Sequence, residues 1–322
     1  MILQPTSKEH LTELLRAATC HREQIRAVNL ALLNHVLAHT PEDMTARVET
    51  GITLAELQRR LAATGQWLPI DPPGPATLTV ADLLARNLSG PRRFGFGTIR
   101  DHLIGLQVVL PDGRLASSGG NVVKNVAGYD LMKLFIGAGC SLGVPVEATF
   151  KLMPRPAAEA IVQSAPGPLD QAEALTQSVL DSPLAPTILD WASLETPASP
   201  ASATAEACVV ILGFAGTAEE VQWQQAEAAK LGFLHSATLD YQARFFAEPA
   251  PAGHVSVLPS RLAATVRELS PAAFVARAGN GVLHHRGAAP SGAVPPVSPA
   301  LQALARRIKE TFDPLGLLPG LC

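Results

Sequence analysis

The sequence is poor in charged residues and in cysteine, and each shortage excludes a class of protein. Only 16% of the 322 residues are charged, the formal net charge is −3, and lysine and arginine form no block. Nucleic-acid binding needs a basic surface, so we expect no nucleic-acid partner. The four cysteines (Cys20, Cys140, Cys208 and Cys322) lie far apart and none has a metal-ligand spacing. This pattern favours free thiols in a reducing cytosol and predicts no metal site.

Membrane and secretion signals are also missing. No apolar run reaches the ~18 residues of a transmembrane helix, and "MILQPTSKEH" has no basic region followed by an apolar one. We therefore expect a cytoplasmic protein without a transmembrane segment. G-x-S-x-G, H-E-x-x-H and Walker A motifs are absent, as are solenoid repeats. Hydrophobic residues make up 47% of the chain, which predicts a sizeable core.

Local patterns predict alternating strands and helices in the first half. T-x-x-E capping boxes at Thr6 and Thr53 open two predicted helices. An Asp112-Gly113 turn joins two strands into a hairpin. Apolar residues alternate with other types from Val144 to Leu152, which predicts a half-buried strand.

The stretch "MPRPAAEA" predicts a domain boundary near residue 156. Beyond it, short predicted strands and helices alternate, including a helix opened by a Thr217/Glu220 capping box and two strands separated by a turn at 279–281. A final amphipathic helix is predicted over "ALQALARRIKETF". This alternation of short strands and helices is typical of an α+β domain of ferredoxin-like style.

Two glycine-rich stretches raise the question of ligand binding. Gly137, Gly139 and Gly143 miss the Rossmann spacing, and a strand follows them where a dinucleotide site needs a helix. In "SGPRRFGFGTIRDH", the glycines permit close approach of a ligand, and Arg92 and Arg93 suit an anion. The alternative for these two arginines is a surface turn in which both are solvated.

Two short polar groups have simpler interpretations than catalysis. Arg100-Asp101-His102 resembles an acid/base cluster, but a local Arg–Asp pair on a strand is the simpler use. His284 and His285 are adjacent on a predicted strand, so they do not share a face, and no third ligand stands at zinc spacing.

Four motifs occur together in a specific order. They are "LAELQRRLAATGQWLPIDPP", "NLSGPRRFGFGTIRDHLIGLQVVLPDGRL", "VVKNVAGYDLMKLFIGAGCSLGVPVEATFKLMPRP" and the terminal "KETFDPLGLLPG". The chain resembles the FAD-binding subunit of bacterial glycolate oxidase (GlcE-like), within the vanillyl-alcohol-oxidase-like flavoproteins. The resemblance is strong from about residue 45 to 156, diffuse beyond it, and returns at the C-terminus.

The resemblance implies an α+β protein with a PCMH-type two-subdomain FAD-binding fold, followed by a ferredoxin-like α+β cap domain. The FAD domain would span 1–156 and the cap or substrate domain 157–322, with the C-terminal segment returning to the FAD domain. The cofactor would be FAD and the substrate a small 2-hydroxy acid. The residues that would contact FAD are Ser89, Gly90, Gly97, Thr98, Gly139, Cys140, Ser141, Gly143 and Val144.

The resemblance also implies partners and structural roles. A homologous flavin subunit and an iron–sulfur subunit would complete the complex, in the cytoplasm or held at a membrane by these partners. Lys124, Asn125, Tyr129 and Asp130 would form a hydrogen-bonding set beside the cofactor cleft. No motif identifies catalytic residues. The arginines and histidines of the cap that could serve, or could be solvated surface residues, are Arg244, Arg261, Arg277, His284 and His285.

Several segments depart from the family pattern. Family members carry a glycine-rich loop after the first helix whose N–H groups receive the FAD pyrophosphate. Here no glycine stands between His21 and Asn34, and we expect the loop and its strand to be deleted. Other cofactor-facing positions are also changed: Thr79 and Val80 replace glycines, Cys140 and Ser141 replace Gly-Thr, and Leu318 replaces Asn. Gly119-Gly120 and Arg92-Arg93 are the candidates for a substitute anion site.

The departures leave two hypotheses open. The chain is an FAD-binding subunit of a 2-hydroxyacid oxidase, or it is a degenerate homologue that keeps the fold, has weakened or lost FAD binding, and acts as a structural partner of a true flavin subunit. A truncated reading of a normal gene is a third possibility.

Overall fold

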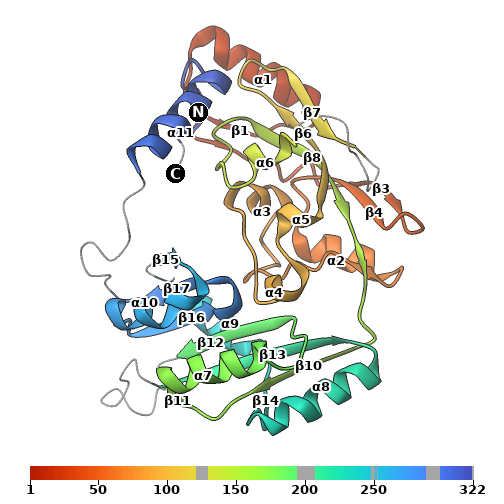
Figure 1. Ribbon diagram of the computed structural model, residues 1–322. Coiled ribbons are helices and arrows are strands. Elements are labelled where there is room, and N and C mark those ends of the chain that lie inside the picture. Colours follow the sequence, from red (N-terminus) through yellow and green to blue (C-terminus); the bar gives the residue numbers. More distant parts are fainter. Residues whose placement is uncertain (121–129, 194–206, 248–250, 252, 288–297, 321–322) are drawn as a thin grey trace. The chain divides into compact units, whose positions relative to one another are not determined.

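The structure is a computed structural model and describes residues 1–120, 130–193, 207–247, 251, 253–287 and 298–320. The chain divides into two compact units (Figure 1). Unit 1 comprises Met1–Ser89, Gly97–Arg155 and Val297–Cys322, and unit 2 comprises Gly90–Phe96 and Pro156–Pro296. Three of the four residues of the set Lys124, Asn125, Tyr129 and Asp130 lie outside the described residues. The fourth, Asp130, pairs with Lys133 at 2.8 Å.

Unit 1 is built on a five-stranded antiparallel sheet. In spatial order its strands are β3 (Val36–Thr40), β4 (Thr45–Glu49), β8 (Val144–Lys151), β6 (Leu103–Val109) and β7 (Leu115–Gly119). The predicted Asp112-Gly113 hairpin is confirmed between β6 and β7, where Gly113 has a φ of 76°.

The prediction that the strand after residue 143 is half-buried is wrong, because β8 is the central strand and is covered on both faces. One face, which includes Phe150, packs into the apolar core. The face expected in solvent carries Glu147, whose carboxylate accepts a hydrogen bond from Lys8 at 2.6 Å. Lys8 is the first residue of the helix α1 (Lys8–His21), so a distant helix supplies the cover that periodicity cannot reveal.

The helices of unit 1 are α1 (Lys8–His21), α2 (Leu54–Ala62), α3 (Val80–Arg86), α5 (Ile99–His102), α6 (Met132–Phe135) and α11 (Pro299–Phe312). Thr53 caps α2 as predicted, by accepting from the N–H of Glu56. The predicted Thr6 cap of α1 is wrong. Ser7 is the cap and accepts from the N–H of His10 at 3.1 Å, while the Thr6 hydroxyl bonds the His10 ring.

Two short strand pairs complete unit 1. β5 (Gln66–Trp67) pairs with β9 (Met153–Pro154), and β1 (Ile2–Leu3) pairs in parallel with β2 (Ala27–Val28). In the region where we expected the family's loop and its strand to be deleted, the structure has the two-residue strand β2 after α1. Its loop continues through residues 29–33.

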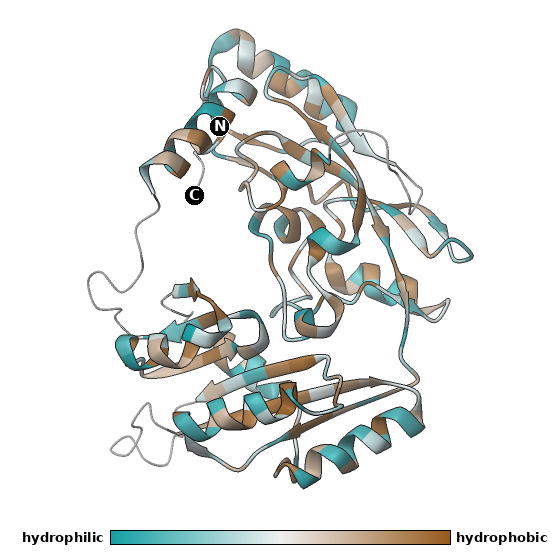
Figure 2. Cartoon of the chain, viewed as in Figure 1, coloured by the Kyte–Doolittle hydropathy of each residue, from teal (hydrophilic) through white to brown (hydrophobic). Residues whose placement is uncertain are grey.

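Unit 2 carries an antiparallel sheet with the path β14-β10-β13-β12-β16-β17-β15, and β11 also pairs with β13. The strand bounds are β10 (Ala158–Gln163), β11 (Gly167–Pro168), β12 (Ile188–Ser193), β13 (Ala207–Gly216), β14 (His235–Ser236), β15 (Gly253–Ser256), β16 (Ala273–Arg277) and β17 (Val282–Arg286). Figure 2 shows strongly apolar strands in this sheet and a largely polar α8 outside it.

The helices of unit 2 are α4 (Arg93–Phe96), α7 (Leu169–Leu180), α8 (Ala218–Lys230), α9 (Asp240–Phe246) and α10 (Leu262–Leu269), with short 3-10 helices η1 (Pro259–Arg261) and η2 (Ala278–Asn280). The helices α7, α8 and α10 bury their apolar faces on one side of the sheet, and α9 packs on the other. The predicted Thr217/Glu220 capping box is confirmed in α8. The α+β class is confirmed for the chain.

Candidate cofactor pocket

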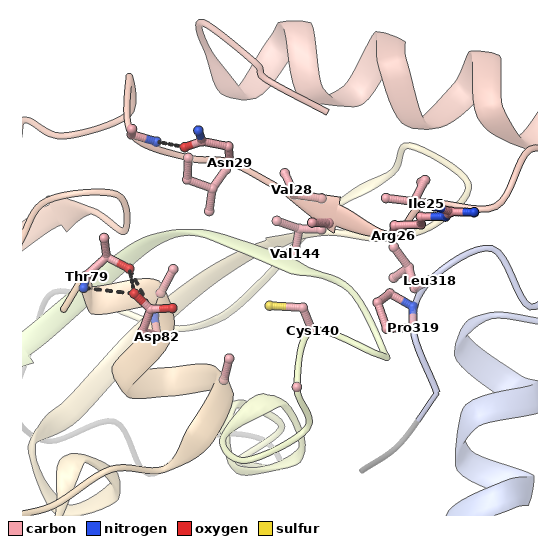
Figure 3. A pocket seen from close by; sticks show the side chains of 16 residues that line it. Ile25, Arg26, Val28, Asn29, Thr79, Asp82, Cys140, Val144, Leu318 and Pro319 are labelled. Carbon is pink, nitrogen blue, oxygen red and sulfur yellow. Dashed lines mark hydrogen bonds between the residues drawn. The ribbon is translucent and has the colours of Figure 1, made fainter. Parts of the chain in front are cut away.

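Four segments that are far apart in the sequence line one pocket in unit 1, with a volume of about 320 Å³ (Figure 3). They are β2 with the loop after it, the start of α3, the turn before β8, and the C-terminal segment. The lining residues are Ile25, Arg26, Ala27, Val28, Asn29, Leu30, Ala31, Thr79, Ala81, Asp82, Ala85, Gly139, Cys140, Val144, Leu318 and Pro319.

The loop after β2 is held by its own apolar residues. Leu30 and Leu33 are buried in the core beside α1, and the N–H of Leu33 donates to the carbonyl of Leu30 at 2.8 Å. The side chain of Asn29 accepts from the N–H of Ala31 at 3.0 Å. Leu30 and Leu33 thus anchor the loop to the core, while Asn29, Ala31 and Leu32 are exposed.

The start of α3 is closed by a reciprocal capping box. The Thr79 N–H and hydroxyl both donate to the Asp82 carboxylate, at 3.0 and 2.6 Å, and the Asp82 N–H donates to the Thr79 hydroxyl at 3.1 Å. Threonine at a position where the family has glycine therefore serves to start a helix.

Cys140 keeps the backbone conformation that a glycine would adopt. Its φ is +59°, in the left-handed region that costs non-glycine residues about 1–2 kcal/mol. Its sulfur points toward the side of the pocket where Asp82 lies (Figure 3). Burial, and secondarily the charge of Asp82, raise the pKa of the Cys140 thiol to about 11. The thiol is therefore neutral at neutral pH.

We expect Cys140→Gly to raise the free energy of unfolding by about 1 kcal/mol, because it removes the left-handed strain. Cys140→Val should lower it, since a β-branched side chain tolerates this conformation least. Thermal denaturation of both variants checks this. Equal stability of the glycine and valine variants would contradict it.

The C-terminal segment is fastened to the pocket by Lys309 of α11. Its ammonium donates to the carbonyl of Ser141 at 2.8 Å, to the Asp313 carboxylate at 2.6 Å, and to the carbonyls of Leu318 and Pro319, both at 3.1 Å. The Asp313 carboxylate also accepts from the N–H groups of Leu317 and Leu318. This network places Leu318 and Pro319 in the pocket wall.

Of the residues predicted to contact FAD, three line this pocket: Gly139, Cys140 and Val144. Two of their neighbours face elsewhere. Ser141 is fully buried and its hydroxyl has no partner among the described residues, and a side chain at Gly143 would meet Val108 at 2.6 Å.

The other four predicted contact residues, Ser89, Gly90, Gly97 and Thr98, do not line the pocket. Gly90 belongs to unit 2. Thr98 opens α5 with Asp101, whose carboxylate accepts from the Thr98 N–H at 2.7 Å. Of the predicted set, the structure thus brings together only Gly139 and Cys140 of the turn before β8 and Val144, the first residue of β8.

Some lining residues carry no motif in the sequence. β2 and Asn29 were missed because the strand is two residues long and follows no alternating pattern. Asp82 could have been found from the T-x-x-D spacing after Thr79. The segments Gly119-Gly120 and Arg92-Arg93, considered as substitute anion sites, do not line the pocket.

Two interpretations of the Gly/Arg-rich segment are corrected. Arg92 is not solvated: its guanidinium donates to Glu159 at 3.0 and 3.2 Å, and its side chain is 14% exposed. Asp101 forms a capping box with Thr98 at the start of the helix α5, where a strand with an Arg100–Asp101 pair was expected.

The donor set of the pocket does not fit a pyrophosphate. Such a group needs a concave run of unused N–H donors, but many N–H groups of the lining residues already donate within the protein. The lining residues whose N–H groups donate in this way are Ile25, Arg26, Asn29, Ala31, Thr79, Ala81, Asp82, Gly139 and Leu318. The glycine-rich cradle expected from the family is replaced by a packed loop.

Unit 2 contains a buried polar cluster where the sequence offered candidate cap residues. Arg277 donates from one guanidinium nitrogen to Asp190 and from another to Gln242 at 2.9 Å. The Tyr241 hydroxyl donates to Asp190 at 2.6 Å. Burial raises the pKa of the Asp190 carboxyl. Arg277 is 2% exposed, so its interpretation as a solvated residue is wrong.

The two adjacent histidines point to opposite faces of β17, as expected. His285 is buried, and the ring of His284 lies 5.1 Å from Phe246 and 5.9 Å from His254, between centroids. Arg244 and Arg261 are exposed. Burial, and secondarily the charge of Arg277, lower the pKa of His284 to about 3.

We expect this shift to make the protein acid-sensitive. The unfolded imidazole titrates near ~6.5, so between pH 6.5 and 3 the unfolded state binds one proton that the native state does not. The free energy of unfolding should therefore fall as pH falls through this window, by up to about 1.4 kcal/mol per pH unit. Denaturant titrations at several pH values give the free energy of unfolding as a function of pH. This free energy should depend less steeply on pH in His284→Gln than in the wild type, whereas His235→Gln, at an exposed position, should keep the wild-type dependence. An identical slope in both variants would contradict the assignment.

Among the described residues, no cluster of potential metal ligands is present. Cys20, Cys140 and Cys208 are free thiols, and Cys322 lies outside the described residues. No helix in the described part of the chain is long and apolar enough to span a bilayer.

Comparison with known proteins adds sequence relatives. A family model described as "FAD binding domain" matches residues 1–119. Glycolate oxidase subunit GlcD of Bacillus subtilis is 30% identical over 177 residues, which cover 55% of this chain and 38% of that protein. Glycolate oxidase subunit GlcE of Escherichia coli is 36% identical over 124 residues (38% of this chain, 35% of that protein). The mitochondrial D-lactate dehydrogenase [cytochrome] of Arabidopsis thaliana is 38% identical over 129 residues (40% and 22%).

The matched segments thus span well under half the length of these curated relatives. A solved structure of an alkyldihydroxyacetonephosphate synthase covers 98% of this chain and 75% of its own, with a TM-score of 0.73 at 18% identity, which shows the shared fold alone. Residues 1–119 therefore match an FAD-binding domain of the PCMH type, and parts of the chain are homologous to glycolate oxidase subunits and D-lactate dehydrogenases.

Proposed function

We propose that the chain is a subunit of an FAD-linked oxidoreductase that oxidises a small 2-hydroxy acid. One observation carries the proposal. Four segments of unit 1 converge on a single pocket, around residues 25–31, 79–85, 139–144 and 318–319. Each segment contains a position where the resemblance implies cofactor contact. The names of the homologues support the reaction class.

The expected partners are a homologous flavin subunit and an iron–sulfur subunit, in the cytoplasm or at a membrane to which the partners bind. A bound FAD would supply the hydride acceptor. Because the pocket does not fit the pyrophosphate, we derive no catalytic step through a flavin held by this chain.

Within unit 2, substrate binding needs a cation for the carboxylate of the 2-hydroxy acid. Arg277 is already committed to Asp190 and Gln242, which makes it a structural residue. Arg244 and Arg261 are exposed and stay candidates. The catalytic residues are therefore not assigned.

The test is purification of the tagged chain from its native host with whatever binds it. The complex should reduce an electron-accepting dye when glycolate or D-lactate is added, and released flavin should be counted per chain. A complex that contains homologous flavin and iron–sulfur subunits yet oxidises neither acid nor any related 2-hydroxy acid would refute the proposal.

A second candidate function is a subunit without a flavin of its own, which supports the flavin of a homologous partner. The occupied N–H donors of the pocket favour it. In that case the complex would oxidise substrate with all flavin assigned to the partner. Stoichiometric FAD in the isolated chain would exclude this candidate.

A further inference from the structure

We propose that the pocket of unit 1 selects against phosphate and accepts an uncharged flat ring, such as a nucleoside base or an isoalloxazine without its phosphates. This proposal deepens the proposed function, on which it rests only for the choice of probes. The cofactor named for the family carries two phosphates, so the expected preference is the reverse of the one a diphosphate cradle would give.

The first argument is the state of the backbone donors. Among the lining residues of the loop after β2, the N–H group of Asn29 donates to the Leu3 carbonyl and that of Ala31 to the Asn29 side chain. Across the pocket, the N–H groups of Ala81 and Gly139 donate to Thr50 and Ala85 at 2.7 and 2.9 Å. A phosphate entering the pocket would lose its water shell without gaining these donors.

The second argument is charge. Among the lining residues, the side chains that carry a charge at neutral pH are Arg26, which is positive, and Asp82, which is negative. Asp82 is fixed in place by Thr79, whereas Arg26 is exposed and extends away from both Asp82 and Cys140 (Figure 3). The neutral Cys140 thiol adds no charge. The fixed carboxylate therefore opposes an anion inside the pocket.

The third argument is the character of the walls. Val28 and Val144 face the pocket from the two strands, and Leu318 closes it from the C-terminal segment. The volume of about 320 Å³ lies at the lower end of the range of small-molecule pockets, ~300–1,000 Å³. Apolar walls with a few polar groups suit a ring system.

The test is a set of equilibrium titrations of the full chain with matched pairs: adenosine against AMP and ADP by calorimetry, and riboflavin against FMN by flavin fluorescence. We expect each added phosphate to weaken binding about 3- to 10-fold, the effect of one nearby like charge. Affinity that rises from adenosine to ADP, or from riboflavin to FMN, would overturn the proposal. So would the absence of binding by both uncharged rings up to about 1 mM.

A charge variant gives an internal check. Asp82→Asn keeps an acceptor for the Thr79 cap and should raise the ratio of AMP affinity to adenosine affinity about 3- to 10-fold. Asp43→Asn, an exposed carboxylate on the β3–β4 hairpin, should change neither affinity. An equal gain for adenosine and AMP in Asp82→Asn would contradict the electrostatic argument. If the variant does not fold, the wild-type titrations still decide.

The two proposals fail in different experiments. If phosphate strengthens binding but the purified complex oxidises a 2-hydroxy acid, only the pocket inference is lost. If the complex oxidises no 2-hydroxy acid but the uncharged rings bind best, only the proposed function is lost.

Discussion

Lys309→Met is expected to lower the free energy of unfolding of unit 1 by about 3–5 kcal/mol, the range seen when one partner of a buried ion pair is removed. The Lys309 side chain is 16% exposed and that of Asp313 is fully buried. Without the ammonium, the Asp313 charge loses its counter-ion, and three carbonyls, of Ser141, Leu318 and Pro319, lose a donor. The C-terminal segment should then detach from the pocket.

Two measurements check this expectation. The melting temperature should fall, and limited proteolysis should cut the variant near residues 313–320 before other sites. Arg306→Met on the same helix is the matched control, because Arg306 is exposed, and it should change the melting temperature little. A Lys309 variant as stable as the Arg306 variant would show that the network contributes nothing.

Arg277→Met is expected to destabilise unit 2 by a similar amount, about 3–5 kcal/mol. Asp190 is 1% exposed and would keep only the hydrogen bond from the Tyr241 hydroxyl and the weaker effect of the Arg93 charge. A buried carboxylate without its counter-ion is costly to keep ionised. The loss of free energy of unfolding in Arg277→Met should therefore be smaller at low pH, where the Asp190 carboxyl is protonated.

The double variant Asp190→Leu/Arg277→Met separates charge from packing. Replacing both members of a buried pair with apolar residues is often neutral or stabilising, so the double variant should recover most of the loss. Chemical denaturation of the two single variants and the double variant gives the coupling energy. Additive losses would show that the pair does not act as a unit.

The elements of both units follow from local signals wherever neighbouring residues control them. Thr217 and Glu220 predict the start of α8 because their side chains satisfy each other's backbone N–H groups. Asp112-Gly113 predicts the β6–β7 hairpin because only the turn itself is needed. The cap of α1 was misplaced by one residue because Thr6 and Ser7 offer similar hydroxyls, and the backbone path from β1 decides between them.

The pocket was predicted only in part for a different reason. The turn 139–144 was predicted from the resemblance, which rests on a motif of consecutive residues, and Cys140 has a left-handed φ of 59° in this turn. β2 and Asn29 were missed because parallel pairing with β1 and burial of Leu30 beside α1 define them. Both the pairing with β1 and the burial of Leu30 depend on residues that are distant in the sequence.

The sequence alone determined the α+β class, most helices and strands, and the resemblance to FAD-binding subunits, because capping boxes, turns and ordered motifs are set by residues close together in the chain. Only the tertiary structure decided that β8 is covered on both faces, that Arg277 is hydrogen-bonded to Asp190, and that many N–H donors of the pocket lining are already used. Each of these depends on a partner many residues away, and the hydrogen-bonding state of a buried group is a property of the packed chain.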